Sequence, residues 1–271
     1  MSQYDSIGSK YNIFKTLPAS VLETFNLHCT LHPFLSGARV LDLACGTGYY
    51  SQKLLEWGAS CVLGVDISQE MISIASSPTP HLTTKPGRVT FRVGNALTLG
   101  KLPDHQPFDI VLDVWLLNYS DSCTQLTQMF RTISANLSPR GIFIGITPHP
   151  VSRDNFDAWA ERINLQEKEN PAKWGLGVRY YEKLASGEGY KTRVYTQPQP
   201  QTDNDSRPVE FYNYHLCKEV YKRAAREGGL HGELEWREVK LPPEALAIQG
   251  EEYWTEYFTE GLHMGVLVVH K

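Results

Sequence analysis

The sequence predicts an α/β fold in which helices cover a mainly parallel sheet. Short apolar runs alternate with helical patterns through the first half of the chain, which is typical of strand–helix units. A glycine-rich turn follows the first of these runs, where such folds pass from strand to helix. The 271 residues are 41% hydrophobic and 21% charged, so the chain can bury a sizeable core and is not disordered.

Five strands are predicted in the first half from apolar runs that end at turn residues. Two proline-containing turns, Pro103–Pro107 and Pro139–Gly141, precede the fourth and fifth strands. The predicted strands are Arg39–Ala44, Cys61–Asp66, Val89–Val93, Phe108–Val114 and Ile142–Ile146.

Helices are predicted between these strands, because apolar residues recur there on one helical face. Ser68 stands in front of the second helix, where its hydroxyl can cap the first turn. The predicted helices are Tyr49–Trp57, Gln69–Ser76 and Cys123–Asn136.

The alternation breaks between Pro148 and about Asn213, which predicts an insertion. Two aromatic and β-branched runs flank the turn sequence ASGEG and predict a hairpin, followed by a mobile loop and a third strand. Regular structure then resumes as a helix and two strands. These segments are Val178–Leu184, Tyr190–Tyr195, the loop Thr196–Pro208, Val209–His215, the helix Lys218–Glu227, Leu234–Leu241 and Gly265–His270.

Composition and charge exclude several classes of protein. The 26 basic residues are outnumbered by 30 acidic ones, which argues against nucleic acid or an anionic membrane as a partner. No apolar run reaches the roughly 18–20 residues of a membrane span, and we expect no signal peptide. The five cysteines form no C-x-x-C pair, so we expect reduced thiols, a cytoplasmic location and no metal site.

The stretch VLDLACGTGYYSQKLLEWGASCVLGVDIS contains the most informative motif. Asp42, Gly46 and Gly48 fall at the junction of the first strand and first helix, and Asp66 ends the second strand. Glycines at such a junction let a ligand lie against main-chain N–H groups, and an acid ending the second strand can accept both ribose hydroxyls of an adenosine. Asp42 either contacts the ligand, directly or through water, or hydrogen-bonds the glycine loop.

Two classes of cofactor use this geometry. Dinucleotide enzymes require G-x-G-x-x-G, but the third position here is Ser51, and Asp42 places negative charge where a pyrophosphate would lie. The pattern D-x-x-x-G-x-G instead resembles motif I of class I S-adenosylmethionine-dependent methyltransferases. The ammonium and sulfonium groups of that cofactor suit an acidic lining.

This resemblance extends over most of the chain. Gly94-Asn95-Ala96 looks like the segment that contacts the adenine, although many members have Asp in place of Asn95. Asp109–Tyr119 looks like the segment that faces the methyl group, and the N-terminal residues 4–11 resemble a lid in which a tyrosine closes over the cofactor. The region NYHLCKEVYKRAAREGGL and the later GEEYWTEYF look like toxoflavin-synthase-type N-methyltransferases that act on small metabolites.

The fold that the resemblance implies is a Rossmann-like, doubly wound seven-stranded sheet whose last strand is antiparallel, with an antiparallel β-rich cap insertion. The whole chain, 1–271, is then a single methyltransferase domain. Its parts are an N-terminal lid (1–35), a cofactor-binding core (36–147), a substrate-cap insertion (148–213) and a C-terminal part of the core (214–271).

The resemblance also implies which residues bind the cofactor, S-adenosylmethionine, which leaves as S-adenosylhomocysteine. They come from the lid and from the carboxyl ends of the first four strands. In chain order they are Tyr4, Tyr11, Asp42, Ala44, Gly46, Gly48, Asp66, Ile67, Met71, Asn95, Ala96 and Asp113.

Substrate and catalytic residues are expected after the fourth and fifth strands and in the insertion, since ligands bind at the carboxyl ends of parallel strands. The catalytic candidates are Tyr119, His149 and Asp113, of which His149 has a side chain able to titrate near neutrality. The substrate-binding candidates are Trp115, Asn118, Tyr119, Tyr180, Tyr212 and Tyr214.

Aromatic residues are concentrated in three segments: the lid, the residues after the fourth strand, and the insertion from Trp159 to Tyr214. We expect these segments to converge over the sulfonium end of the cofactor and to form an aromatic-lined pocket for a small, ring-containing acceptor.

The implied function is N-methylation of a heteroaromatic or amine metabolite in secondary metabolism. O-methylation of a small phenol or acid is the alternative within the same class. A NAD(P)-dependent Rossmann oxidoreductase, or a protein that binds the cofactor without turnover, is the alternative from a different class. The expected partner is a small-molecule substrate, and the sequence does not distinguish a monomer from a homodimer.

Overall fold

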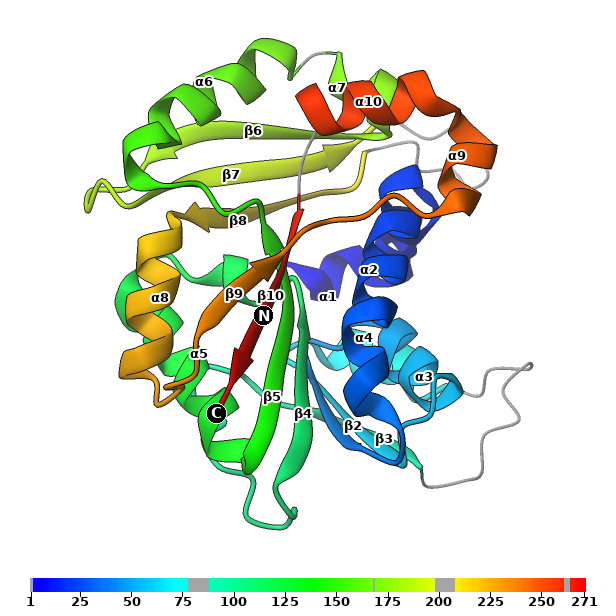
Figure 1. Ribbon diagram of the computed structural model, residues 1–271, viewed down its shortest axis with the longest axis vertical. Coiled ribbons are helices and arrows are strands. Elements are labelled where there is room, and N and C mark those ends of the chain that lie inside the picture. The colour runs from blue at the N-terminus through cyan, green and yellow to red at the C-terminus, as the bar shows by residue number, and fades with distance from the viewer. Residues whose placement is uncertain (1, 78–87, 168, 198–207, 261–263) are drawn as a thin grey trace.

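A seven-stranded sheet with helices on both faces forms the body of the molecule (Figure 1). The computed structural model describes residues 2–77, 88–167, 169–197, 208–260 and 264–271. The strand order is β3-β2-β1-β4-β5-β10-β9, and only the pairs that include β10 are antiparallel. The predicted fold, including its antiparallel last strand, is confirmed.

The first four strands lie where apolar runs were predicted. They are β1 (Arg39–Leu43), β2 (Cys61–Asp66), β3 (Val89–Val93) and β4 (Phe108–Val114). β1, β2 and β4 are largely buried, as parallel strands between helical layers must be, whereas β3 lies at the edge of the sheet and contains no buried residue. Their register aligns Asp42 with Gly64 and Leu112, so the glycine loop after β1 lies at the carboxyl edge of the sheet.

The fifth strand is longer than predicted. β5 (Leu137–Pro148) includes Pro139–Gly141, which was expected to be a turn. Its pairing with β4 jumps from Phe108↔Leu137 to Ile110↔Ile142, so four residues bulge out of the ladder while the strand continues. β9 (Leu234–Arg237) is shorter than predicted, and β10 (Met264–His270) begins one residue earlier.

Two groups of helices enclose two separate apolar cores. α5 (Cys123–Asn136) and α8 (Lys218–Glu227) cover one face of the sheet, while α2 (Pro18–Leu35) and α3 (Tyr49–Glu56) cover the other (Figure 1). α4 (Gln69–Ala75) packs beside β3 and β2, with the predicted cap: Ser68 Oγ accepts a hydrogen bond from Met71 N at 3.2 Å.

The N-terminal segment α1 (Tyr4–Ile7) and η1 (Gly8–Thr16) precedes α2 and packs on α4. Two short helices, α9 (Pro243–Gln249) and α10 (Glu251–Glu260), lie between β9 and β10 and were not predicted. Within the described ranges, no helix combines the length and apolar character needed to cross a bilayer. All five cysteines are free thiols, as predicted.

A three-stranded antiparallel sheet, which we call the cap sheet, lies beyond the carboxyl ends of β4 and β5 (Figure 1). It contains the predicted hairpin β6 (Leu176–Lys183) and β7 (Gly189–Thr196), followed by β8 (Glu210–Leu216). Residues 198–207 of the predicted loop lie outside the described residues. Between β5 and the cap sheet the chain also forms two unpredicted helices, α6 (Phe156–Gln166) and α7 (Asn170–Trp174).

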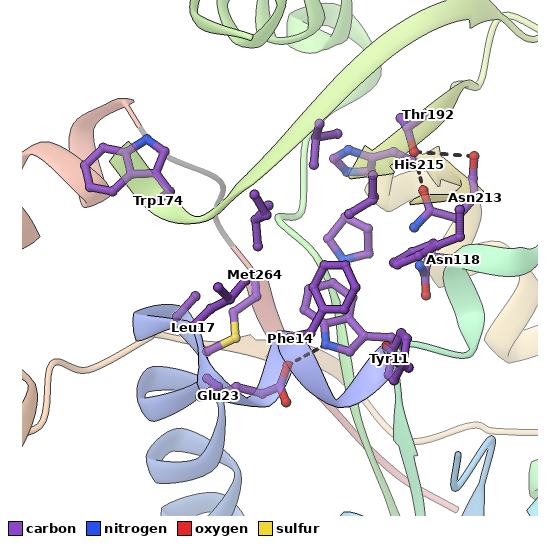
Figure 2. A pocket seen from close by; sticks show the side chains of 18 of the residues that line it. Tyr11, Phe14, Leu17, Glu23, Asn118, Trp174, Thr192, Asn213, His215 and Met264 are labelled. Atoms are coloured by element: carbon purple, nitrogen blue, oxygen red, sulfur yellow. Dashed lines mark hydrogen bonds between the residues drawn. The ribbon is translucent and has the colours of Figure 1, made fainter. Parts of the chain in front are cut away.

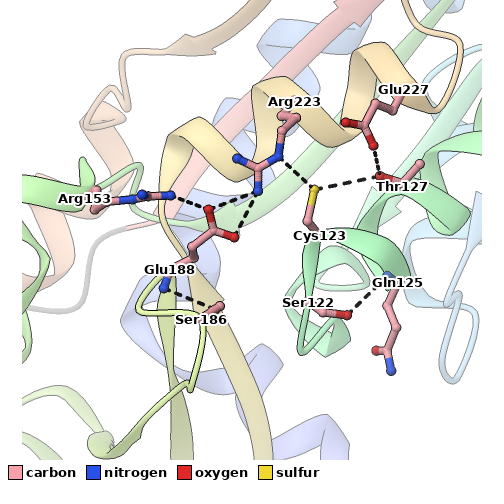
Figure 3. A network of polar contacts seen from close by, with 9 residues as sticks. All are labelled: Ser122, Cys123, Gln125, Thr127, Arg153, Ser186, Glu188, Arg223 and Glu227. Carbon is pink, nitrogen blue, oxygen red and sulfur yellow. Dashed lines mark hydrogen bonds and ion pairs between the residues drawn. The ribbon is translucent and has the colours of Figure 1, made fainter.

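A polar network attaches the hairpin turn of the cap sheet to the helical layer below it (Figure 3). Arg223 of α8 donates to both carboxylate oxygens of Glu188, at 3.0 and 2.9 Å, and its Nε lies 3.2 Å from Cys123 Sγ. Arg153 also contacts Glu188. Charge-assisted hydrogen bonds of this kind fix orientation, so the turn is held against α5 and α8.

Candidate active site

A cavity of about 70 Å³ lies between the glycine loop after β1 and the N-terminal segment. Seven of the residues predicted to bind the cofactor line it, together with two predicted substrate residues, Trp115 and Tyr119. The seven are Tyr4, Tyr11, Asp42, Ala44, Gly46, Asp66 and Met71.

Asp66 connects the loop after β1 with the start of α4. Its Oδ2 accepts a hydrogen bond from Gly46 N and its Oδ1 from Ser68 N, both at 2.9 Å. A carboxylate has about four lone-pair sites, so capacity to accept a hydrogen bond from a ligand remains. Burial raises the pKa of Asp66, and hydrogen bonds from the backbone N–H groups of Ser68, Gly46 and Ile67 oppose that shift.

Asp42 is the more deeply buried acid. Burial raises the pKa of Asp42 to about 7, while the hydroxyl of Ser51 donates to its Oδ2 at 2.5 Å and opposes the shift. Ser51 occupies the position where a dinucleotide motif requires its third glycine. The departure from that motif therefore has a structural role, because the serine holds the acid that faces the cavity.

Among the residues that the structure describes, two that are not glycine have a positive φ, and both follow core strands at this edge of the sheet. Ala44 has φ 57° after β1, and Trp115 has φ 70° after β4. Left-handed backbone is unfavourable for residues with a Cβ and is enriched at functional sites. Both residues line the first cavity.

The N-terminal segment is joined to several parts of the molecule at once. The hydroxyl of Tyr4 contacts that of Tyr119, and Ser68 Oγ donates to Asp5 Oδ1 at 2.6 Å. The side-chain amide of Gln3 forms two hydrogen bonds with the backbone of Tyr212 on β8, at 2.9 and 3.0 Å. The segment thus lies across the first cavity and reaches the cap sheet.

Five predicted cofactor residues do not line this cavity. A Cβ on Gly48 would meet the Phe91 ring at 2.9 Å, so this glycine serves helix–sheet packing. Asn95 Oδ1 accepts from Leu97 N at 2.9 Å and stabilises a turn. The others are Ile67, which is exposed, Ala96, which packs in the core, and Asp113.

Asp113 was predicted to be a catalytic and cofactor residue, and its position favours a structural role. The side chain is fully buried and lines neither this cavity nor the larger cavity beside it. Its oxygens accept hydrogen bonds from Leu116 N at 2.5 Å and Leu117 N at 3.3 Å, which stabilise the turn after β4. Burial raises the pKa of Asp113 to about 8.

A larger cavity, of about 150 Å³, lies between the cap sheet and the main sheet (Figure 2). Its lining is mostly aromatic and aliphatic, as the distribution of aromatic residues predicted. The predicted residues Trp115, Asn118 and Tyr180 contribute to it. Tyr11, Lys15 and Trp115 line both cavities, so the two adjoin.

Tyr180 and His215 form a hydrogen-bonded pair in the wall that the cap sheet provides. His215 Nε2 lies 2.8 Å from the carbonyl oxygen of His149, so Nε2 must carry the proton, and Nδ1 accepts from the Tyr180 hydroxyl at 2.7 Å. Trp159 Nε1 donates to that hydroxyl at 3.2 Å. Burial lowers the pKa of His215 to about 3, so its ring stays neutral.

Glu23 of α2 is a site residue that the sequence did not reveal. Its Oε1 accepts from Lys15 Nζ and the Tyr50 hydroxyl, and its Oε2 accepts from Trp115 Nε1, each at 2.5 Å. Burial favours a higher pKa for Glu23, but the charge of Lys15 and these hydrogen bonds bring it below its ordinary value. Figure 2 shows Glu23 below Phe14 at one side of the cavity.

Three other predicted residues lie outside the larger cavity. Tyr212 and Tyr214 project from the opposite face of the cap sheet, because side chains alternate along β8 and Phe211, Asn213 and His215 face inward. Tyr212 is 44% exposed and pairs there with Tyr181 at a ring distance of 5.9 Å.

His149, a predicted catalytic residue, also lies outside that lining, and its ring stacks on Trp159 at 4.8 Å. Burial lowers its pKa.

The fold and the acid-lined glycine loop define an α/β domain that binds a nucleoside-containing cofactor at the carboxyl ends of its parallel strands. The methyltransferase domain family matches residues 34–209. The chain belongs to that family and to the class I S-adenosylmethionine-dependent superfamily. This membership confirms the predicted class of enzyme and its cofactor, and it sets aside the oxidoreductase alternative. Membership of the toxoflavin-synthase-type subgroup stays a prediction.

Relatives of this chain include two curated bacterial proteins. An uncharacterized protein of Haemophilus influenzae is 32% identical over 174 residues, which are 64% of this chain and 66% of that protein. A ubiquinone biosynthesis O-methyltransferase of Agrobacterium fabrum is 29% identical over 171 residues, 62% of this chain and 62% of that protein. The chain thus spans slightly less than two thirds of the length of these relatives.

Solved structures share the fold at low sequence identity. An S-adenosylmethionine-dependent methyltransferase from Mesorhizobium loti has a TM-score of 0.56 at 19% identity and covers 92% of this chain and 98% of its own. A magnesium protoporphyrin IX methyltransferase from Synechocystis with bound SAH has a TM-score of 0.52 at 14% identity and covers 93% of this chain and 82% of its own.

The residues of the first cavity suit S-adenosylmethionine. Asp42 and Asp66 supply negative charge for a cofactor that carries an ammonium and a sulfonium. A Cβ built on Gly46 would meet no atom within 4 Å, so space for a ligand lies beside the loop. Tyr4, Tyr11 and Tyr119 offer aromatic faces, which attract cations.

Proposed function

We propose that this chain transfers a methyl group from S-adenosylmethionine, held in the first cavity, to a small ring-containing acceptor in the larger cavity. The observation that carries the proposal is that Tyr11, Lys15 and Trp115 line both cavities. A donor and an acceptor held on either side of these residues would meet there. Aligning two reactants in this way accounts for up to about 7–11 kcal/mol of barrier reduction.

When bound, S-adenosylmethionine would supply an activated methyl group: a bond from the acceptor atom to the methyl carbon would form as the carbon–sulfur bond breaks, and S-adenosylhomocysteine would leave. The chain's own contribution is binding, alignment and the exclusion of water. We assign Asp66 to the ribose hydroxyls, Asp42 to the positively charged part of the cofactor, and the N-terminal segment to closure over it. In this assignment residues 148–213 form the substrate cap, with Tyr180 and Trp115 as walls of the acceptor site.

We favour nitrogen as the methylated atom. His215 is neutral and both its ring nitrogens are engaged, and Glu23 has a lowered pKa, so neither is suited to remove a proton near neutrality. A heteroaromatic or neutral amine nitrogen already offers a lone pair and needs no strong base. This supports N-methylation of a small metabolite.

O-methylation of a phenol or acid is the second candidate. It is favoured by the ubiquinone biosynthesis O-methyltransferase among the relatives. An oxygen acceptor must lose a proton. O-methylation therefore predicts a rate of methyl transfer that rises with pH according to the pKa of the acceptor.

The test is release of S-adenosylhomocysteine from methyl-labelled S-adenosylmethionine in the presence of ring nitrogen, phenol and carboxylic acid compounds. We expect labelled product from ring nitrogen compounds, and at least a tenfold loss of rate in Trp115→Ala. Labelled phenol ethers or methyl esters instead would establish the second candidate. Binding of the cofactor without transfer to any of the three groups would indicate a protein that does not turn over.

A further inference from the structure

The larger cavity contains hydrogen-bond acceptors for which the described part of the chain supplies too few donors. Asn118 follows β4, is 2% exposed and lines this cavity. Its Oδ1 has no hydrogen-bond partner among the described residues. A buried amide oxygen without a donor is unfavourable, and at a ligand site its natural partner is a group of the ligand.

Glu23 presents a second incompletely used acceptor. Two donors, Lys15 and Tyr50, occupy Oε1, whereas Trp115 alone donates to Oε2. A carboxylate oxygen has two lone-pair sites, so Oε2 can accept one more hydrogen bond. Glu23 lines the same cavity, and Figure 2 places it and Asn118 on different sides of the group of side chains drawn.

The remaining polar groups of the cap wall largely satisfy one another. Thr192 donates to Asn213 Oδ1, and Tyr180 donates to His215, whose other nitrogen bonds a backbone carbonyl. At Asn118 and Glu23, the cavity walls therefore offer a ligand unused hydrogen-bond acceptors. Negative charge is already present there on Glu23, next to the compensating charge of Lys15.

Resting on the proposed function, we infer that the methyl acceptor is a planar ring compound without a carboxylate, bearing at least one N–H or O–H group besides the methylated atom. Asn118 and Glu23 determine this specificity by accepting a hydrogen bond from that group. A carboxylate on the ring is rejected, because it brings further acceptors and negative charge to oxygens that need donors.

The test is an equilibrium binding series on one ring: 6-hydroxyquinoline, 6-methoxyquinoline and quinoline-6-carboxylate. Binding to the full chain is followed by calorimetry, with and without saturating S-adenosylhomocysteine. We expect the hydroxy compound to bind at least tenfold more tightly than the methoxy compound, and the carboxylate to bind most weakly. A ratio near one, tighter binding of the carboxylate, or no binding of any member overturns the inference.

Two variants locate the selectivity. Asn118→Leu removes the amide at nearly constant size, and Glu23→Gln removes the charge while keeping one acceptor oxygen. At least one of them should bring the hydroxy-to-methoxy ratio toward one. The matched controls are Asn155→Leu and Glu182→Gln, at exposed positions, which should keep the wild-type ratio. An unchanged ratio in both cavity variants contradicts the assignment to these residues.

This measurement is independent of turnover. If S-adenosylmethionine does not bind but the ratio is tenfold, the proposed function fails and the selectivity of the cavity stands. If the cofactor binds and the ratio is one, the selectivity fails and methyl transfer to another kind of acceptor stands.

Discussion

Asp42 is the residue whose protonation we expect to depend most directly on the positive charge of the bound cofactor. It lies one residue before the end of the buried strand β1, and burial raises its pKa to about 7, so the isolated protein holds this carboxyl partly protonated at neutral pH. A cation bound beside it stabilises the ionised form and lowers that pKa. Binding of S-adenosylmethionine should therefore release a proton from Asp42.

The expected result is an affinity for S-adenosylmethionine that rises by up to about tenfold between pH 6 and pH 8. The sign follows because, below the pKa of Asp42, part of the binding free energy is used to remove its proton. Calorimetry at pH 6, 7 and 8 in two buffers of different ionisation enthalpy measures both the affinity and the released proton. Asp42→Asn should bind S-adenosylmethionine more weakly, with an affinity that does not change with pH. If the affinity of this variant rises with pH as in the unmodified chain, the released proton comes from another group.

Three of the residues predicted from the sequence belong to one local motif. Asp42, Gly46 and Asp66 lie within 25 residues of each other in a pattern that itself indicates a ligand. Glu23 was not predictable, because its partners Tyr50 and Trp115 lie 27 and 92 positions away in the chain. Only the three-dimensional fold brings these donors to one carboxylate.

At the scale of elements, strand alternation decides which aromatic residues of β8 reach the acceptor cavity. Both faces of this strand carry aromatic rings, so its sequence shows that it is a strand but not which face turns inward. Packing settles the question: Phe211 lies against Tyr4, Tyr11 and Phe14 at ring distances of 5.4–6.0 Å. Tyr212, the next residue, faces outward.

Adjacent substitutions on β8 test this arrangement. Phe211→Ala should lower the affinity for ring compounds at least tenfold and reduce the free energy of unfolding by roughly 3 kcal/mol, because it removes a buried ring. Tyr212→Ala should change the affinity and the free energy of unfolding little, since it removes an exposed ring. Ligand titration and urea unfolding of both variants provide the measurements, and equal effects of the two substitutions would show that the inward face has been misassigned.

Element boundaries were predicted best where periodicity and stop signals coincide. β2, β3, β4, α5 and α8 have the predicted limits. The bulge in β5 was missed, because Pro139 and Gly141 signal a turn locally while pairing with β4 continues the strand. α6 and α7 were missed because the insertion was interpreted from its β-rich second half.

At the scale of the molecule, the doubly wound sheet places the glycine loop at one edge, and the insertion places a second sheet over that edge. The N-terminal segment connects the two sheets: Asp5 accepts a hydrogen bond from Ser68 at the start of α4, and Gln3 accepts one from the backbone of β8. In the function that we propose, closure of this segment over the cofactor also completes the wall of the acceptor cavity, because Tyr11 belongs to both linings.

The most direct test of the central claim is calorimetric titration of the chain and of its Asp66→Asn variant with S-adenosylmethionine, with NADH as the competing cofactor class. We predict one S-adenosylmethionine bound per chain, an affinity at least tenfold weaker in Asp66→Asn, and no heat from NADH. The matched control, Asp154→Asn at an exposed position, should bind as the unmodified chain does. Binding of NADH, or S-adenosylmethionine binding that does not depend on Asp66, would contradict the site described here.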